Sequence, residues 1–209
     1  MLVEKATSQE ELNDVFKLRY RVYCLERGYE NADDYPEGIE SDEYDPYSVH
    51  FIAYVESAPV GTVRLILDNP IGLPVGRYCN TDLKAISPDT GRIAEISRLA
   101  VRSDATTGCS IERSKVTLGL IKEVYCASKE LGMGHLVSAM SKPLERLLKR
   151  CGMMGFKKAG PPVDYHGLRT PYYAACEDLE SELFNRRKDI FEFFFPSYAD
   201  EFAKRLKAA

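Results

Sequence analysis

The sequence has no Cys-x-x-Cys pair and no histidine at metal-ligand spacing, although it contains six cysteines. These cysteines stand singly along the chain, so we interpret them as reduced packing residues and expect neither a metal site nor a disulfide framework. The sequence also lacks any run of about 18 uncharged apolar residues, and its opening, MLVEKATSQEEL, lacks the apolar run of a signal peptide. We therefore expect a cytoplasmic protein with no transmembrane segment.

An excess of basic charge is missing as well. The 28 Lys and Arg residues are mixed with 32 Asp and Glu residues, giving a formal net charge of −4. The chain therefore has no basic footprint for nucleic acid, and nucleic acid is not an expected partner. With 209 residues, 44% of them hydrophobic, it is long enough for one large domain or two small ones. We expect a single domain over residues 1–209, with a helical C-terminal extension from about residue 175.

The segment GRIAEISRLAV, residues 91–101, has the composition of a buried strand but carries three polar residues, Glu95, Ser97 and Arg98. In a strand, successive side chains point to opposite faces, so Glu95 and Ser97 are expected on one face and Arg98 on the other. Buried charges are tolerated when they are paired or functional. The segment therefore indicates either a structural ion pair or a catalytic carboxylate.

The N-terminal part of the chain predicts a helix from about Ser8 to Arg27. Overlapping Ser/Thr-x-x-Glu capping boxes precede apolar residues at helical spacing, and Gly28 ends the pattern. Arg19 and Tyr23 share the otherwise apolar face. Arg19 either extends past its neighbours to water or points its charge into a site.

About twenty residues, 29–49, then form a long acidic loop interrupted by two prolines. Loops of this length in compact domains are usually functional or disordered, and the four tyrosines of this one favour docking on the protein over disorder.

The remaining pattern predicts an α/β fold with a mixed sheet and right-handed crossovers. The expected elements are strands at 50–55 and 60–67, an irregular segment at 68–89, a helix at about 110–131, a strand at 135–140, a helix at 143–150, a strand near 154–159, a polar loop at 160–173 and a helical tail from about 174. The late segment FEFFFPSYADEF is compatible with packing, with a dimer contact or with a peripheral membrane contact.

Four motifs occur in one order and at one family's spacing. They are Leu18-Arg19-x3-Tyr23 followed by Tyr29, then Glu40-x-Asp42-x2-Asp45, Gly61-x2-Arg64, and Glu95-Ile96-Ser97-Arg98. Together they resemble the acyl-homoserine-lactone synthases and the related N-acyl amino acid synthases of the GNAT superfamily. The segments RYRVYCLERGYE, ESDEYD, AEISRLAV and PVDYHGLRTPYYA look most like the acyltransferases found with exosortase and PEP-CTERM sorting systems.

The resemblance implies a GNAT-like acyl-CoA N-acyltransferase fold, with a twisted mixed sheet flanked by helices. It also implies transfer of an acyl group from a phosphopantetheine thioester to an amine, with no bound cofactor. The segment before the central helix, RSDATTGCSIERSK, has only Gly108 where acetyl-CoA enzymes of the superfamily have a glycine-rich turn. This favours acyl carrier protein over acyl-CoA as the donor. The donor-binding residues expected are Leu99, Ala100, Val101, Arg102, Arg113 and Lys115.

By the same resemblance, the expected catalytic residues are Glu95, as a base acting through a water, with Ser97 and Arg98. Backbone N–H groups between Glu95 and Val101 are expected to hold the oxyanion. The charged cluster of Asp42, Asp45 and Arg64, joined by Arg98, is expected to fasten the acidic loop over the sheet. The acceptor-binding residues expected are Arg19, Tyr23, Tyr29 and His166.

The acceptor and the function leave alternatives open. Tyr23 and Tyr29 stand where the lactone synthases carry Phe and Trp, which favours an amino acid or other small amine over S-adenosylmethionine. His166 is either a second acid or base or a structural residue of a polar loop. Two alternatives to an N-acyl amino acid synthase are an acyl-homoserine-lactone synthase that uses S-adenosylmethionine and a non-catalytic acyl-binding module.

Overall fold

A computed structural model of the chain describes residues 1–87, 92–104 and 112–196. The strands are β1 Leu2–Ala6, β2 Ser48–Val55, β3 Ala58–Ile66, β4 Arg92–Val101, β5 Met133–Met140, β6 Lys157–Lys158, β7 Val163–Asp164 and β8 Leu168–Ala175. The helices are α1 Gln9–Tyr20, α2 Pro74–Tyr78, α3 Leu83–Ile86, α4 Arg113–Glu130, α5 Lys142–Arg150, α6 Cys176–Arg186 and α7 Lys188–Phe194. The predicted beginning of the central helix near Ser110, the glycine Gly108 and the end of the FEFFFPSYADEF segment lie outside the described residues.

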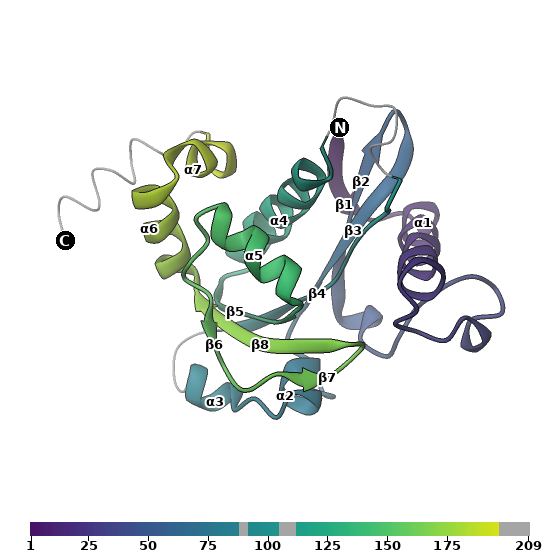
Figure 1. The fold of residues 1–209 in the computed structure, drawn as a ribbon, viewed down its shortest axis with the longest axis horizontal. Coiled ribbons are helices and arrows are strands. Elements are labelled where there is room, and N and C mark those ends of the chain that lie inside the picture. The colour runs from purple at the N-terminus through teal and green to yellow at the C-terminus, as the bar shows by residue number, and fades with distance from the viewer. Residues whose placement is uncertain (88–91, 105–111, 197–209) are drawn as a thin grey trace.

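The strands form one mixed sheet in the order β1-β2-β3-β4-β5-β8-β6, with β7 paired to β8. The pair β4 and β5 is parallel and is joined by α4, whereas the other pairs are antiparallel. In Figure 1, β1 to β3 stand upright while β5 and β8 lie across the view, so the sheet turns sharply at β4. The predicted α/β class with a mixed sheet is confirmed.

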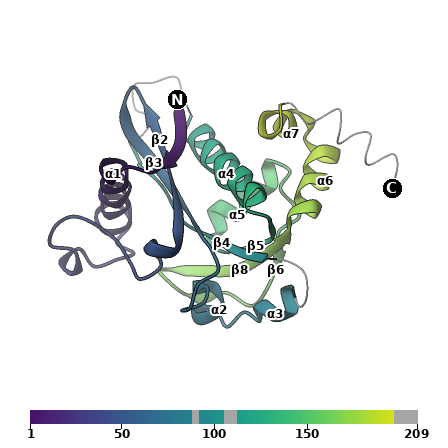
Figure 2. The same ribbon diagram turned by 180° about the vertical axis from the view of Figure 1, so that it is seen from behind.

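The helices cover both faces of this sheet. Helix α1 packs on one face through Val15, which contacts Ile52 of β2. Helix α4 packs on the opposite face, where Leu120 lies in the same core as Phe51, the neighbour of Ile52 in sequence. Figures 1 and 2 show α5, α6 and α7 on the α4 side, with α2 and α3 across the sheet from them.

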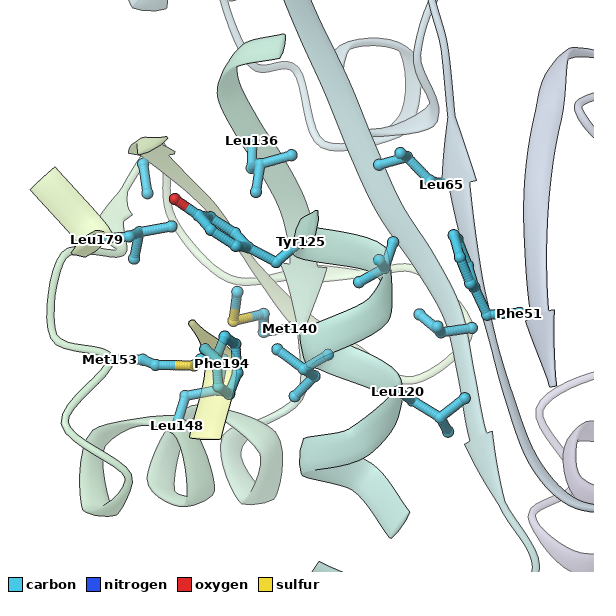
Figure 3. Packing of buried hydrophobic residues seen from close by; sticks show 14 of the residues in the cluster. Phe51, Leu65, Leu120, Tyr125, Leu136, Met140, Leu148, Met153, Leu179 and Phe194 are labelled. Carbon is cyan, nitrogen blue, oxygen red and sulfur yellow. The ribbon is translucent and has the colours of Figure 1, made fainter. Parts of the chain in front are cut away.

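The main core lies on the α4 side. Figure 3 shows Phe51 and Leu65 on the strand side of α4, while Met140, Leu148, Met153 and Phe194 gather on its other side. The burial of these apolar side chains is the main favourable free-energy term that holds the helices to the sheet. The other face is covered by α1, α2, α3 and the acidic loop, and its two apolar clusters are smaller than the main core.

The N-terminal helix begins as the sequence predicts. Ser8 and Glu11 form a capping box in which each side chain accepts a hydrogen bond from the other residue's backbone N–H. The α-helical part ends at Tyr20, and the segment Arg21–Glu26 continues as a π-helix. Gly28 then adopts a φ of +61°, in the left-handed region that favours glycine.

Several elements differ from the expected ones. Strand β1 was not predicted, and the irregular segment 68–89 contains the short helices α2 and α3. Both helices are too short to show a periodic pattern. The hairpin turn consists of Glu56 and Ser57, both with positive φ, whereas turns of this kind usually carry Asn-Gly or Asp-Gly.

The largest error concerns the segment 160–173, which was predicted as a polar loop. It forms the hairpin of β7 and β8, and β8 pairs along its length with β5 near the centre of the sheet. The strand expected near 154–159 shrinks to the two residues of β6. Within the described ranges, no helix combines the length and the apolar character needed to cross a membrane.

Candidate active site

A β-bulge in β4 brings the polar residues of this strand to one face. Thr62 pairs with Ala100 and Arg64 pairs with Ser97, so the ladder advances two residues on β3 and three on β4. Arg98 takes up the additional residue with a φ of +49°. The expectation that Arg98 lies on the opposite face from Glu95 is therefore wrong, because the bulge interrupts the alternation on which it rested.

The contacts of β4 confirm this arrangement. Ser97 Oγ accepts a hydrogen bond from Arg64 Nε at 3.0 Å, and Arg98 reaches the carboxylates of the acidic loop on the same face. Leu99 and Val101 belong to the apolar core on the α4 face. One short segment thus presents a polar set to the acidic loop and an apolar pair to the core.

Strands β4 and β5 separate after Glu95. The parallel ladder runs from Arg92 and Met133 to Glu95 and Val137. Beyond it, β4 continues to Val101 with no strand partner on that side among the described residues. Side chains bind the exposed carbonyl groups of β4: Ser138 Oγ donates to the Ile96 carbonyl at 2.8 Å, and the Tyr23 hydroxyl donates to the Leu99 carbonyl at 3.3 Å. A cavity of about 230 Å³ lies between the separated strands. We call it the cleft.

Glu95 lies where the two strands part. Its side chain is buried, and its Oε2 accepts a hydrogen bond from the backbone N–H of Val75 in α2 at 2.8 Å. Among the described residues, no cation forms an ion pair with Glu95. Burial raises the pKa of this carboxyl group to about 8, since the hydrogen bond from Val75 and the charge of Arg64 only partly offset the loss of hydration.

A small pocket of about 50 Å³ adjoins Glu95. We call it the acceptor pocket, because it includes Tyr23 and His166, which the family resemblance predicts to bind the acceptor. The polar and aromatic side chains that line it are Tyr23, Glu95, Ser97, Arg98, Tyr165, His166 and Arg169. It lies beside the cleft, because Tyr23, Arg98 and Arg169 border both cavities.

The charged cluster holds the acidic loop against the sheet. Arg19 is fully buried and forms ion pairs with Glu40 and, at 2.6 Å, with Asp45. Arg64 binds Asp42 at 2.5 Å and Asp45 at 2.6 Å. The proposal that Arg19 extends to water is wrong, and its place in an acceptor site is also not supported, since Arg19 borders neither the cleft nor the acceptor pocket.

Arg98 completes this cluster from β4. It pairs with Asp42 at 3.0 Å, with Glu40 at 3.1 Å and with Glu30 at 3.5 Å, and its guanidinium lies over the ring of Tyr23. Each of the three arginines therefore faces at least two carboxylates. Such matching is what allows charges to stay ionised out of water.

The electrostatics of the cluster follow from this pairing. Burial alone would raise the pKa of Asp42 and of Glu40, but the surrounding arginines together outweigh it, with Arg64 contributing most at Asp42 and Arg19 at Glu40. Both pKa values therefore lie below their ordinary range. Burial lowers the pKa of the nearby His50 to about 4, which keeps its imidazole neutral beside Asp45. The cluster is an ionised network, whereas Glu95 next to it is a nearly isolated carboxyl group.

Tyr23 borders both cavities and Tyr29 borders the cleft, with their ring centroids 5.9 Å apart. His166 lies at the tip of the β7–β8 hairpin with a φ of +50°, and its Nδ1 is 2.7 Å from a carboxylate oxygen of Glu30. This contact ties the hairpin to the beginning of the acidic loop. His166 also borders the acceptor pocket, which places it beside Glu95.

The chain matches the family described as N-acyl amino acid synthase FeeM over residues 14–177. It belongs to this family. The match spans every residue of the charged cluster, the bulged strand and the β7–β8 hairpin. The chain is therefore a member of a family of acyltransferase enzymes related to the acyl-homoserine-lactone synthases.

Curated relatives and solved structures agree with the family. An acyl-homoserine-lactone synthase of Aeromonas hydrophila is 24% identical over 142 residues, 68% of either chain, and one of Vibrio anguillarum is 25% identical over 151 residues, 71% of this chain and 77% of that one. The structure of FeeM, an N-acyl amino acid synthase from uncultured soil microbes, has a TM-score of 0.65 at 15% identity and covers 87% of this chain and 93% of that chain. The acyl-homoserine-lactone synthase LasI has a TM-score of 0.66 at 18% identity and covers 88% and 94%. At such identities the structures show the GNAT-like fold that the sequence predicted.

The predicted donor residues of this family member divide into two groups. Leu99, Ala100, Val101 and Arg113 line the cleft, and Arg113 donates a hydrogen bond to the Val101 carbonyl at 2.7 Å. Arg102 instead binds Asp104 and the Pro59 carbonyl. Lys115 is exposed in the first turn of α4 and does not line the cleft.

Two arginines of the site were not predicted. Arg27 borders the cleft together with Arg113, and burial and the charge of Arg27 lower the pKa of Arg113. Arg169 borders both the cleft and the acceptor pocket. Arg27 and Arg169 lie inside two of the segments that carry the family resemblance, RYRVYCLERGYE and PVDYHGLRTPYYA, but neither belongs to one of the four spaced motifs. The segment of Arg169 also has the composition of a loop, so the sequence did not place this arginine on a strand.

Proposed function

We propose that the protein transfers an acyl group from the thioester of acyl carrier protein to the amine of an amino acid or another small amine. The observation that carries this proposal is the position of Glu95, which lies between the acceptor pocket and the point where β4 and β5 separate. Its carboxyl group is buried and has no cation partner among the described residues. Ser97 and Arg98 belong to the same site and hold its polar face in place.

The acyl thioester is assigned to the cleft between β4 and β5. The Arg102 N–H donates to the Val60 carbonyl of β3 at 3.0 Å, so the preceding residue, Val101, directs its N–H and C=O groups away from β3. The bond from Arg113 to the Val101 carbonyl supports this direction. The Val101 N–H is therefore available to the cleft, where it is a candidate donor to the developing oxyanion.

The chemistry requires one proton to leave the ammonium form of the acceptor before its nitrogen can attack. Glu95 accepts this proton, directly or through a water, for which a pocket of about 50 Å³ has room. The nitrogen then forms a bond to the thioester carbonyl carbon. The C–S bond breaks, the nitrogen loses its second proton, and the leaving thiolate takes up that proton to give the free thiol. A pKa of about 8 places the base close to the pKa of the amine that it deprotonates.

The acyl chain is assigned to the apolar side of the cleft. Ile121 and Phe156 line both the cleft and a second, apolar pocket, which is bordered further in by Met153 and Phe194. These side chains come from α4, α7 and the segment after α5. A long acyl chain could extend from the cleft into this apolar pocket, where it would lie against the main core.

The donor is assigned as acyl carrier protein on the basis of its single phosphate. Arg27 and Arg113 border the mouth of the cleft, and neither forms an ion pair with a described carboxylate. Two such cations suit one phosphate diester, and Arg102 and Lys115 lie in the surrounding segments. The narrower resemblance to the acyltransferases of exosortase and PEP-CTERM systems is part of this proposal, and a gene for such a system beside this one would support it.

Synthesis of an acyl-homoserine lactone is the second candidate, because curated relatives of the chain carry that name. This reaction would use S-adenosylmethionine as the acceptor and would form a lactone ring after acylation. Tyr23 and Tyr29, in place of Phe and Trp, favour another acceptor. The two candidates differ in product mass and are separated by the same assay.

The test is an assay of the purified protein with long-chain acyl carrier protein and, in turn, amino acids, simple amines and S-adenosylmethionine, with mass spectrometry of the products. The expected product is an N-acyl amino acid, formed with a kcat/KM far above that for acetyl-CoA. A lactone product would replace this function by the second candidate. A comparable kcat/KM with acetyl-CoA would refute the assignment of the donor.

A further inference from the structure

The acceptor pocket contains two guanidinium groups in opposite electrostatic situations. Arg98 is matched by three carboxylates at 3.0 to 3.5 Å. Arg169 forms no ion pair with any described residue, and its one hydrogen bond runs from Nη1 to the Leu168 carbonyl at 3.2 Å. Four of its five N–H donors are therefore open to a ligand.

The position of Arg169 is nonetheless fixed. Its guanidinium carbon lies 4.7 Å from the centroid of the Tyr29 ring, a cation–π contact that holds the group over the aromatic face. Gly167 packs closely against both groups: a Cβ at this position would lie 3.3 Å from Arg169 Nη1 and 3.5 Å from the Tyr29 ring. The hairpin thus carries a half-buried cation in a defined place beside the base.

We propose that Arg169 is the residue that binds the carboxylate of an α-amino acid acceptor and thereby excludes amines that lack a carboxylate. This inference rests on the proposed function and adds a specificity-determining residue to its acceptor pocket. An α-amino acid carries its amine and its carboxylate on one carbon atom. A pocket of about 50 Å³ with Glu95 and Arg169 in its wall matches that arrangement.

The charges around the pocket support the same assignment. A planar guanidinium binds a carboxylate through two parallel N–H bonds, and such pairs are among the strongest polar contacts in proteins. Arg98 cannot serve in this way, because Glu30, Glu40 and Asp42 already occupy it. Arg169 is therefore the guanidinium in the wall of this pocket that is free to take an anion.

The first experiment measures binding without turnover. Nuclear magnetic resonance titrations compare the twenty protein amino acids with their primary amides, on the wild-type protein and on Arg169→Gln and Arg169→Lys. We expect an amino acid to bind more tightly than its amide to the wild type, by about tenfold to a hundredfold for a hydrogen-bonded charge. Arg169→Gln should abolish this preference, and Arg169→Lys should restore part of it.

Arg77→Gln is the matched control. Arg77 also lies over a tyrosine ring, that of Tyr78 at 5.2 Å, but it pairs with Glu43 and borders neither cavity. This variant should keep the full preference for amino acids. Equal binding of amino acid and amide by the wild type, or an equal loss of both in Arg169→Gln, would overturn the inference.

The second experiment uses the acyl-transfer assay. Arg169→Gln should raise the KM for the amino acid and leave the KM for acyl carrier protein unchanged, although the residue also borders the cleft. A rise in the KM of the donor alone would assign Arg169 to the thioester and overturn the inference. Carboxylate-dependent binding without any acyl transfer would refute the proposed function and still support this site, which distinguishes the two failures.

Discussion

Two sets of three arginines lie a short distance apart in this protein and serve different purposes. The first set comprises Arg19, Arg64 and Arg98; the second comprises Arg27, Arg113 and Arg169. Members of the first set are buried and face two or more carboxylates each. Members of the second set border the cleft and form no ion pair with any described residue. An arginine already matched by the protein's own carboxylates fixes the fold, whereas an unmatched one at a cavity is available to a ligand.

The difference follows from the cost of removing charge from water. A buried guanidinium without a partner would cost several kcal/mol, so Arg19 and Arg64 are compatible with folding because the acidic loop supplies Glu40, Asp42 and Asp45. The cations of the cleft keep contact with water until a substrate arrives. Their carboxylate or phosphate partner would then belong to the substrate, and the interaction would add to binding instead of stability.

The largest effect is expected when the matched set is broken. Within the described part of the chain, Arg19 is the one guanidinium that contacts both Glu40 and Asp45, so Arg19→Met should leave two buried carboxylates short of a partner. We expect a loss of about 3–5 kcal/mol in the free energy of unfolding. Urea denaturation measures it.

The control for this change is Arg27→Met in the unmatched set. Arg27 is exposed and has no ion pair among the described residues, so its replacement should alter the free energy of unfolding by less than about 0.5 kcal/mol. Equal losses in the two variants would remove the distinction between the sets. Recovery of stability when Arg19→Met is combined with Glu40→Leu would strengthen it.

The second effect concerns Glu95, the carboxyl group that stands outside both sets. Glu95→Gln keeps the shape of the side chain and an oxygen that can accept the Val75 N–H, but it removes the base. We expect kcat to fall about a hundredfold, the scale of general base catalysis. The deficit should shrink at high pH, where more of the acceptor amine is already neutral. Steady-state kinetics across a range of pH measures both.

Thermal unfolding of the same variant separates catalysis from structure. The folded pKa of Glu95, about 8, lies above its ordinary value of 4.5. The stabilising contribution of the neutral carboxyl group is therefore complete below about pH 4.5 and is lost as the pH rises through 8. Glu95→Gln has no such loss, so its melting temperature should rise relative to the wild type over this interval. A variant that is destabilised at every pH and active in proportion to its folded fraction would exclude Glu95 from the mechanism.

Much of the fold and of the matched set could be predicted from the sequence. The capping box at Ser8, the alternating strands before Gly61 and the periodicity of α4 are local patterns, and local patterns show directly in the sequence. Arg64 and Asp45 could be assigned to one cluster because the family motifs name them together. A charge inside an apolar segment is itself a signal, since it must have a partner.

The bulge and the unmatched set could not be predicted in this way. The bulge at Arg98 depends on how β4 pairs with β3, and the sequence of β4 alone does not show this pairing. Strand β8 contains Pro171 and follows a segment rich in turn residues, so its pattern is that of a loop. Arg27 and Arg169 lie in segments that carry the family resemblance, but only the tertiary structure shows that each lies at a cavity.

A smaller effect than that of Glu95→Gln is expected from pH alone. The base must be ionised to accept a proton, so wild-type kcat/KM should rise with pH until Glu95 has titrated, near pH 8. The rise should be about tenfold between pH 7 and the plateau. A profile that is flat from pH 6 to 9 with the wild type, at constant folded fraction, would contradict the raised pKa of the catalytic group.

The smallest effect is expected from the unmatched arginines at the mouth of the cleft. Arg27 and Arg113 are expected to bind the single phosphate of the donor, and the charge of Arg27 already contributes to the lowered pKa of Arg113. An anion between them would relieve this repulsion. Arg27→Gln and Arg113→Gln should each raise the KM for acyl carrier protein about threefold to tenfold, the range of a partly exposed charge pair, and the increase should diminish at high salt.

Arg21→Gln is the matched control. Arg21 begins the π-helix that Arg27 caps at its other end, but it already pairs with Glu26 and Asp104. Its KM for the donor should stay unchanged. If Arg21→Gln raised this KM as much as the cleft variants do, matching by carboxylates would not distinguish structural from ligand-binding arginines here.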